Sequence, residues 1–233
     1  MRVVGVWHFH GVKTFILTTL LLGMAATTFA DTKSELDNRV RKLMAKFDSL
    51  QANAEARIPA EKLKQAKGVI VMERTKGGLV FGYENGFGVA MIKNNGKWGA
   101  FSFMNSHEGS FGAQIGGKST FCVMLLMNDA ARDRLIATKV DFGGEAGGTG
   151  GSSSGGVGDD FTKEPPVLVF GESKGLYGGA TIKGGSVASD DKANQNYYGQ
   201  FYSIKDILFE KKVEPSETAA EFGRKLEEVT KDK

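Results

Sequence analysis

Two glycine-containing motifs in the chain fit patterns that serve phosphate binding and nucleophilic catalysis in other proteins. Residues 112–119 (GAQIGGKS) fit the phosphate-binding loop pattern G-x-x-x-x-G-K-[ST], and residues 151–155 (GSSSG) fit the nucleophile-elbow pattern G-x-S-x-G. The first pattern needs a buried strand before it and a helix that begins at its lysine, because backbone amides at the helix N-terminus hold the phosphates. The second needs a serine on a turn from strand to helix and a histidine later in the chain.

Neither motif has the flanking sequence that its chemistry needs. Residues 105–111 (NSHEGSF) are too polar for the first strand, and residues 120–127 (TFCVMLLM) favour a buried strand, with a buried helix as the alternative. The serine motif lies in a glycine–serine tract, and no histidine follows His107. We therefore predict that the chain is not an enzyme and that it binds no nucleotide.

Residue types that hold metals or form disulfides are sparse after the first thirty residues. One histidine, His107, and one cysteine, Cys122, remain there. A single cysteine forms no internal disulfide, and the apolar neighbours of Cys122 predict a buried, unreactive thiol. Glu145, Asp159 and Asp160 lack the regular ligand spacing of a cation site. We therefore expect neither a metal nor any other cofactor.

Residues 1–30 predict a cleavable signal peptide. The segment has two basic residues, Arg2 and Lys13, and no acidic residue, and an apolar run extends from Phe15 to about Ala26. That run is shorter than the roughly 20 residues of a membrane-spanning helix. Small residues stand at the −3 and −1 positions of a cleavage site that ends at Ala30. We expect a periplasmic or secreted protein, peripheral to a membrane, with an uncleaved anchor as the alternative.

The charge balance narrows the classes of partner. The chain has 30 lysine and arginine residues against 27 aspartate and glutamate residues, whereas a nucleic-acid-binding domain usually has a strong basic excess. We therefore predict no nucleic-acid partner, and any anion binding must come from local clustering of charge. An exported chain would also meet little ATP and no cytoplasmic actin.

The segment 31–57 predicts an amphipathic helix over residues 33–56. Thr32 and Glu35 form a capping-box pattern at its start. Apolar residues recur at helical spacing at Leu36, Val40, Leu43, Phe47 and Leu50. The other face carries the basic residues Lys33, Arg39, Lys42 and Lys46. Two uses of the apolar stripe stay open: it can lie in the headgroup plane of a membrane, or it can pack against a sheet, as amphipathic helices usually do.

Residues 58–230 predict one domain of short strands with flanking helices. A short helix is expected from Pro59 to Gly68, and further helices at 128–138, 190–198 and 215–230. Strands are expected at 69–72, 79–81, 87–92, 98–103, 109–116, 119–127, 166–171 and 176–188, with turns at Asn85–Gly86 and Asn95–Gly96. Residues 143–160 predict a flexible glycine–serine loop.

Glycine makes up 32 of the 233 residues, about twice the usual share. Glycine at that density among strands indicates bulges and close packing of the sheet. The fold class that we predict is α+β, with a glycine-rich, strongly curved antiparallel sheet that is barrel-like and is flanked by N- and C-terminal helices.

Four stretches, in this order, resemble the SYLF family, a lipid-binding domain also known for actin association in yeast. They are residues 58–71 (IPAEKLKQAKGVIV), 76–89 (KGGLVFGYENGFGV), 109–116 (GSFGAQIG) and 173–199, which begins SKGLYGG and ends NYYG. The resemblance covers roughly residues 58–230, which makes that region a SYLF-like domain. It implies binding of phosphoinositides and other acidic lipids through basic surface residues, helped by the N-terminal helix.

The resulting expectation is a non-enzymatic lipid-binding module that holds phosphoinositide-like or other anionic phospholipid headgroups at a membrane surface. Each lysine near an anionic surface contributes about 1 kcal/mol, and salt weakens the attraction. The candidate lipid-binding residues are Lys33, Arg39, Lys42, Lys46, Lys76 and Lys174. The alternative is a structural or protein-interaction component of the cell envelope, in which the apolar stripe binds an envelope or host protein.

Overall fold

The computed structural model describes residues 31–78, 81–111, 118–137, 140–141, 166–171, 175–176 and 186–231. Residues 31–233 form one compact unit. The predicted signal peptide, the glycine–serine loop 143–160 with its serine motif, and Lys174 lie outside the described residues.

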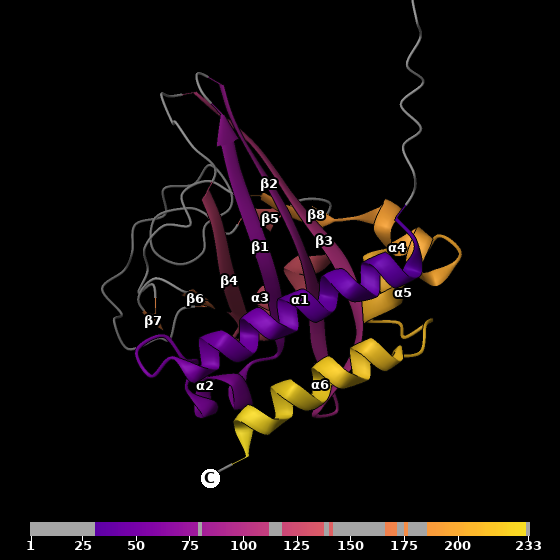
Figure 1. Ribbon diagram of the computed structural model, residues 1–233. Coiled ribbons are helices and arrows are strands. Elements are labelled where there is room, and N and C mark those ends of the chain that lie inside the picture. The colour runs from indigo at the N-terminus through magenta and orange to yellow at the C-terminus, as the bar shows by residue number, and fades with distance from the viewer. Residues whose placement is uncertain are drawn as a thin grey trace, which may run out of the picture. The chain divides into compact units, whose positions relative to one another are not determined.

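An antiparallel sheet of eight strands forms the centre of the described fold (Figure 1). The strands are β1 (Gly68–Gly78), β2 (Phe81–Asn94), β3 (Lys97–Phe111), β4 (Lys118–Leu126), β5 (Val140–Asp141), β6 (Val167–Gly171), β7 (Gly175–Leu176) and β8 (Ser186–Ser189). Their spatial order is β5-β8-β3-β2-β1-β4-β6-β7. Within the described ranges no pairing joins β5 to β7, so the sheet is open. The predicted barrel-like closure is therefore wrong, because a barrel needs its two edge strands to pair.

Helices cover both faces of the sheet. They are α1 (Lys33–Ala52), α2 (Ala60–Gln65), α3 (Asp129–Asp133), the short 3₁₀ helix η1 (Arg134–Ile136), α4 (Asp191–Tyr198), α5 (Ile204–Leu208) and α6 (Glu217–Thr230). Residues of α1, α4 and α6 share one buried cluster with the sheet, and residues of α3, η1 and α5 share a second. Figure 1 shows α1 and α6 side by side across the front of the sheet.

The two clusters follow from the alternation of side chains along each strand. In β1, Val69 and Val71 belong to the cluster under α1 and α6, whereas Ile70 and Met72 belong to the cluster on the opposite face. A strand that is buried on both faces has a continuous apolar sequence. This is why residues 69–72 lack the polar–apolar alternation of a half-exposed strand.

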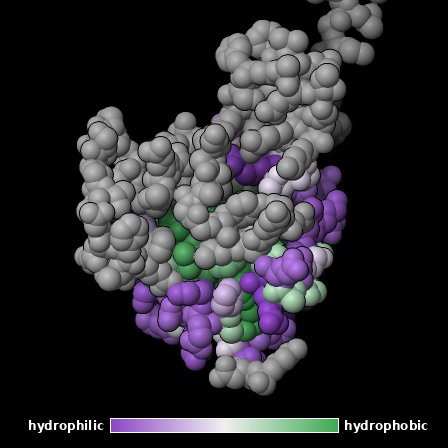
Figure 2. Space-filling model, turned by 90° about the vertical axis from the view of Figure 1, so that its left-hand side faces the viewer, coloured by the Kyte–Doolittle hydropathy of each residue, from purple (hydrophilic) through white to green (hydrophobic). Residues whose placement is uncertain are grey.

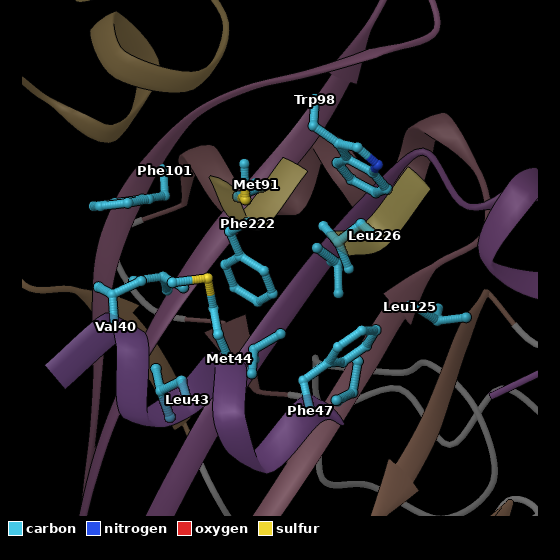
Figure 3. Close-up of a cluster of buried hydrophobic side chains, with 14 of the residues drawn as sticks. Val40, Leu43, Met44, Phe47, Met91, Trp98, Phe101, Leu125, Phe222 and Leu226 are labelled. Carbon is cyan, nitrogen blue, oxygen red and sulfur yellow. The ribbon is translucent and has the colours of Figure 1, made fainter. Parts of the chain in front are cut away.

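Helix α1 supplies a large part of the core on its face of the sheet. The predicted capping box is present, since Thr32 accepts a hydrogen bond from the backbone of Glu35 and the Glu35 carboxylate accepts one from the Thr32 backbone. The apolar stripe is at most 2% exposed along its length, at Leu36, Val40, Leu43, Met44, Phe47 and Leu50. Figure 3 shows part of this stripe converging with Phe222 and Leu226 of α6 and with side chains of the sheet. Of the two uses predicted for the stripe, packing on the sheet is the one observed.

The expected end of α1 at residue 56 is wrong, because the helix ends at Ala52 and Asn53 follows in an extended conformation. The Asn95–Gly96 turn is confirmed, with φ angles of 53° and 79°. The Asn85–Gly86 turn is wrong, because both residues lie inside β2. A Cβ atom at Gly86 would lie 2.8 Å from the Cβ of Ser106. Glycine at position 86 thus serves close packing between strands, which competes with its use as a turn signal.

The region around Lys118 confirms the strand interpretation of the phosphate-binding motif. Residues 118–126 form β4, so no helix begins at the lysine, while residues 112–117 lie outside the described part. Cys122 is 5% exposed in this strand, as the apolar neighbours predict. Helix α5 was not predicted from the sequence, because its five residues are too few for a helical repeat.

Buried Asn194 joins α4 to the sheet. Its Oδ1 accepts a hydrogen bond from the backbone N–H of Phe103 at 2.8 Å, and its Nδ2 donates to Ser102 Oγ at 3.0 Å. Nδ2 also lies 3.2 Å from Ser189 Oγ. The side chain is fully buried, and these bonds satisfy its polar atoms as a buried amide requires. The network fixes the start of α4 beside β3.

Candidate functional site

The side of the sheet that faces α1 changes from apolar to polar along its strands. The register places residues two apart on the same face, so successive rows across β3, β2, β1 and β4 can be compared. The rows are Phe103, Val89, Val71 and Val123; then Asn105, Phe87, Glu73 and Phe121; then His107, Asn85, Thr75 and Ser119. The first row lies in the core, and the third row is entirely polar. A polar surface therefore begins where the core under α1 ends.

Helix α1 presents a row of cations beside this polar surface. Arg39, Lys42 and Lys46 recur at spacings of three and four residues, which places them on one side of the helix. A groove of about 470 Å³ lies beside these cations, and both α1 and the strands line it. Its walls are Arg39, Lys42 and Leu43 of α1 with Glu73, Thr75, Asn85, Gly86, Phe87, Asn105, His107 and Asp190. We refer to this cavity as the basic groove.

The three cations differ in how they are paired. The Arg39 guanidinium lies 2.7 Å from the Asp31 carboxylate and stacks over the Phe87 ring at 4.4 Å. The Lys46 ammonium lies 3.2 Å from the Glu73 carboxylate. Lys42 forms no hydrogen bond or ion pair with any described residue. Lys42 is therefore the cation of this row that is most available to an external anion.

Glu73 sits at the junction of α1, β1 and β4. Its carboxylate accepts a hydrogen bond from the Ser119 hydroxyl in addition to the contact with Lys46. Burial raises the pKa of this carboxyl, but the hydrogen bonds from Ser119 and Lys46 and the attraction of the two lysines outweigh it, so that the pKa is lowered. Glu73 therefore stays ionised at neutral pH.

The far wall of the basic groove carries amide and imidazole groups. The Nδ1 atom of His107 lies 2.8 Å from Oδ1 of Asn85. Asp190 caps α4 by accepting a hydrogen bond from the backbone N–H of Ala193 at 3.0 Å. The groove thus combines the cations Arg39 and Lys42 and the carboxylates of Glu73 and Asp190 with hydrogen-bonding side chains and an aromatic ring. The two cations attract an anionic group, and the two carboxylates oppose it.

The structure brings together half of the six predicted lipid-binding residues. Arg39 and Lys42 line the basic groove, and Lys46 lies beside it in contact with Glu73. Lys33 lies apart from them, 5.1 Å from the centroid of the Tyr197 ring on α4. Lys76 lies on β1 in register with Glu84 and Lys118, and its side chain is outside the described part, as is all of Lys174.

Sequence reasoning missed the strand side of the groove. Glu73, Thr75, Asn105 and His107 each follow a buried run and share the parity of its core residues. That pattern of polar residues continuing an apolar face is the signal that could have found them. It becomes informative once the pairing register of the strands is known.

A second groove, of about 740 Å³, lies where α1 and α6 end. Its walls include Phe47, Ile58 and the ion pair of Lys225 with Asp48, whose atoms are 2.6 Å apart. It contains none of the predicted lipid-binding residues.

Figure 2, seen from the left-hand side of Figure 1, shows hydrophilic residues on both flanks of a narrow hydrophobic strip.

The described part of the chain contains neither a candidate metal site nor a candidate membrane-spanning helix. No group of three or more histidine, cysteine, aspartate and glutamate side chains is placed there to hold a metal ion. Among the same residues, no helix has the length and apolar character that crossing a membrane requires.

Comparison with known proteins places the chain among relatives of one kind. Residues 107–229 match the Ysc84 family, described as "Las17-binding protein actin regulator". An SH3 domain-containing protein of Schizosaccharomyces pombe is 27% identical over 191 residues, which are 79% of this chain and 44% of that protein. LAS seventeen-binding protein 3 of Saccharomyces cerevisiae is 28% identical over 184 residues, which are 76% of this chain and 40% of that protein.

A mammalian relative shows the same pattern. The SH3 domain-containing YSC84-like protein 1 of Rattus norvegicus is 27% identical over 158 residues, which are 65% of this chain and 46% of that protein. The chain thus spans less than half the length of these curated relatives. No solved structure gives a significant match. These matches confirm the resemblance that the four sequence stretches indicated.

Proposed function

The chain belongs to the Ysc84 family, which is the SYLF family of the sequence resemblance, and from this premise we propose that it binds anionic phospholipid headgroups at a membrane surface. The observation that supports this function is the row of Arg39, Lys42 and Lys46 on α1. Arg39 and Lys42 line the basic groove, and Lys46 lies beside it in contact with Glu73. The family description and the relatives' names are those of regulators and binding proteins, not of enzymes. A binding role without a chemical step is consistent with both.

Binding through charge fits the fold better than binding through an inserted helix. Burying one large apolar side chain contributes about 1.5–3 kcal/mol, so the six residues of the α1 stripe contribute roughly 9–18 kcal/mol. A whole domain is stable by about 5–15 kcal/mol. Lipid could cover the stripe of a detached α1, but the sheet face beneath it would then be exposed to water. The exposed cations of α1 act instead while the helix stays in place.

The proposed membrane lies outside the cytoplasm. Residues 1–30 have the charge, apolar run and small residues of a cleavable signal peptide. We propose that cleavage after Ala30 releases a periplasmic or secreted protein that associates with a membrane surface. N-terminal sequencing of the exported protein tests this, and a sequence that begins at Asp31 is the expected result. A protein that keeps residue 1 would contradict it.

A protein partner is the second candidate function. It is supported by the family description and by the printed name of one relative, both of which describe Las17 binding. The apolar stripe of α1 is buried. A partner would therefore bind exposed groups, of which Phe201, 61% exposed, is the largest apolar one in the described part. Crosslinking of a specific partner in the absence of vesicle binding would favour this function over the first.

Co-sedimentation with vesicles tests the lipid function. We expect recovery with vesicles that contain phosphatidylglycerol, little recovery with phosphatidylcholine alone, and release by added salt. Lys42→Ala should weaken binding about fivefold, the factor for one lysine near an anionic surface. Lys97→Ala is the matched control, because Lys97 is exposed at the β2–β3 turn, at the opposite end of the strands from the groove. Equal recovery with neutral and anionic vesicles would refute the function.

A further inference from the structure

The basic groove already contains an anion that belongs to the chain. The Glu73 carboxylate lines the groove, lies 3.2 Å from the Lys46 ammonium and accepts a hydrogen bond from Ser119. Neither partner of the ion pair is sealed off, since the Lys46 side chain is 34% exposed and that of Glu73 is 31% exposed. An external anion can therefore reach the same ammonium group that Glu73 holds.

This contact separates two neighbouring lysines on α1. Lys42 has no ion-pair or hydrogen-bond partner among the described residues and feels Glu73 only at longer range, so an incoming headgroup meets an ammonium group that no described carboxylate contacts. Lys46 is engaged, so a headgroup that approaches it must either displace Glu73 or remain beside a carboxylate of its own sign. Because both partners are partly exposed, the pair itself contributes little stability. It can therefore be broken by a competing anion.

Resting on the proposed function, we propose that Glu73 is a built-in competitor, which holds Lys46 and thereby limits the affinity of the basic groove for anionic headgroups. Without a ligand, Glu73 links α1 to β1 and, through Ser119, to β4. With a ligand, the headgroup replaces the carboxylate at Lys46. Glu73 sets the affinity of the site in this way without taking part in the contact to lipid.

Replacing Glu73 by its neutral isostere tests the competition directly. Glu73→Gln should bind phosphatidylglycerol-containing vesicles about fivefold more tightly than the wild type, because one more lysine becomes available to the surface. Glu221→Gln is the matched control. Glu221 is 37% exposed and lies 3.6 Å from Arg41 on the other side of α1, so its substitution makes the same change of charge away from the groove. An equal gain in both variants would overturn the proposal, since it would reflect net charge alone.

A second comparison does not depend on the folding of Glu73→Gln. In a wild-type background, Lys46→Ala should weaken vesicle binding by less than about twofold, whereas Lys42→Ala should weaken it about fivefold. Where Glu73→Gln folds, as checked by its thermal melting curve, Lys46→Ala in that background should cost about fivefold as well. Equal effects of Lys42→Ala and Lys46→Ala in the wild type would overturn the competitor role.

The outcomes for the two proposals are distinct. Wild-type binding to anionic vesicles with no gain in Glu73→Gln refutes the competitor and leaves the lipid function standing. Binding by Glu73→Gln and not by the wild type supports the competitor strongly. Absence of binding by both proteins refutes the lipid function, and the competitor with it.

Discussion

Replacing Phe47 by alanine separates a core role of α1 from a membrane-inserting role. Phe47 is 1% exposed, and its ring meets that of Phe222 edge to face with centroids 6.1 Å apart. Removing a buried phenylalanine side chain typically lowers the free energy of unfolding by about 3–5 kcal/mol. About 0.5–1.5 kcal/mol of this comes from the aromatic pair. We expect that loss of stability, together with unchanged vesicle binding by the folded variant.

Urea denaturation followed by circular dichroism measures the free energy of unfolding. If the dependence of this free energy on urea concentration is the same in the variant and the wild type, the substitution has changed stability alone. Vesicle co-sedimentation without denaturant measures lipid binding. Ser49→Ala is the control on the exposed side of α1 and should change the free energy of unfolding by less than about 0.5 kcal/mol. A loss below about 1 kcal/mol for Phe47→Ala would refute the core role. Loss of vesicle binding by the folded variant would show that the stripe itself contacts lipid.

Three further predictions test the fold. Asn194→Ala should lower the free energy of unfolding by about 1–3 kcal/mol in urea denaturation, because it leaves a buried backbone N–H of β3 without its acceptor. Gly88→Ala should lower the melting temperature more than Gly99→Ala does, since a Cβ would lie 2.5 Å from a backbone oxygen of β1 at position 88 and 3.4 Å from its nearest neighbour at position 99. Hydrogen bonds from Lys212 and from a neighbouring serine lower the pKa of Asp206, so the ionised carboxylate stabilises the fold above the ordinary pKa of about 4. The stability advantage of the wild type over Asp206→Asn, measured by denaturation at a series of pH values, should therefore shrink as the pH falls below about 4.

The elements that follow a local rule could be predicted from the sequence. The helical repeat from Leu36 to Leu50 and the capping box place α1, and the Asn95–Gly96 dipeptide places a turn. Both depend on neighbours a few residues away. The apolar run after the phosphate-binding motif also indicated a strand, and β4 begins at Lys118.

The errors that concern the sheet come from non-local pairing. Gly86 resembles a turn residue, but its cross-strand neighbours hold it inside β2. The glycine content that suggested a closed sheet reflects close approaches such as that of Gly88 to β1. For the same reason, only the helix side of the basic groove could be predicted from the sequence. The spacing of Arg39, Lys42 and Lys46 is local, whereas Glu73, Asn85 and His107 meet through the register of three strands.

The composition of the groove walls determines when, during folding, the chain can first bind a ligand. Its residues come from α1, from the middle of three strands and from the start of α4, so segments from early and late in the chain must meet before the cavity exists. An unfolded chain carries the same lysines but no arranged site. Under the proposed function, a chain that crosses a membrane in an extended state does not hold headgroups on the way. Its capacity to bind appears only when α1, the three strands and the start of α4 have come together.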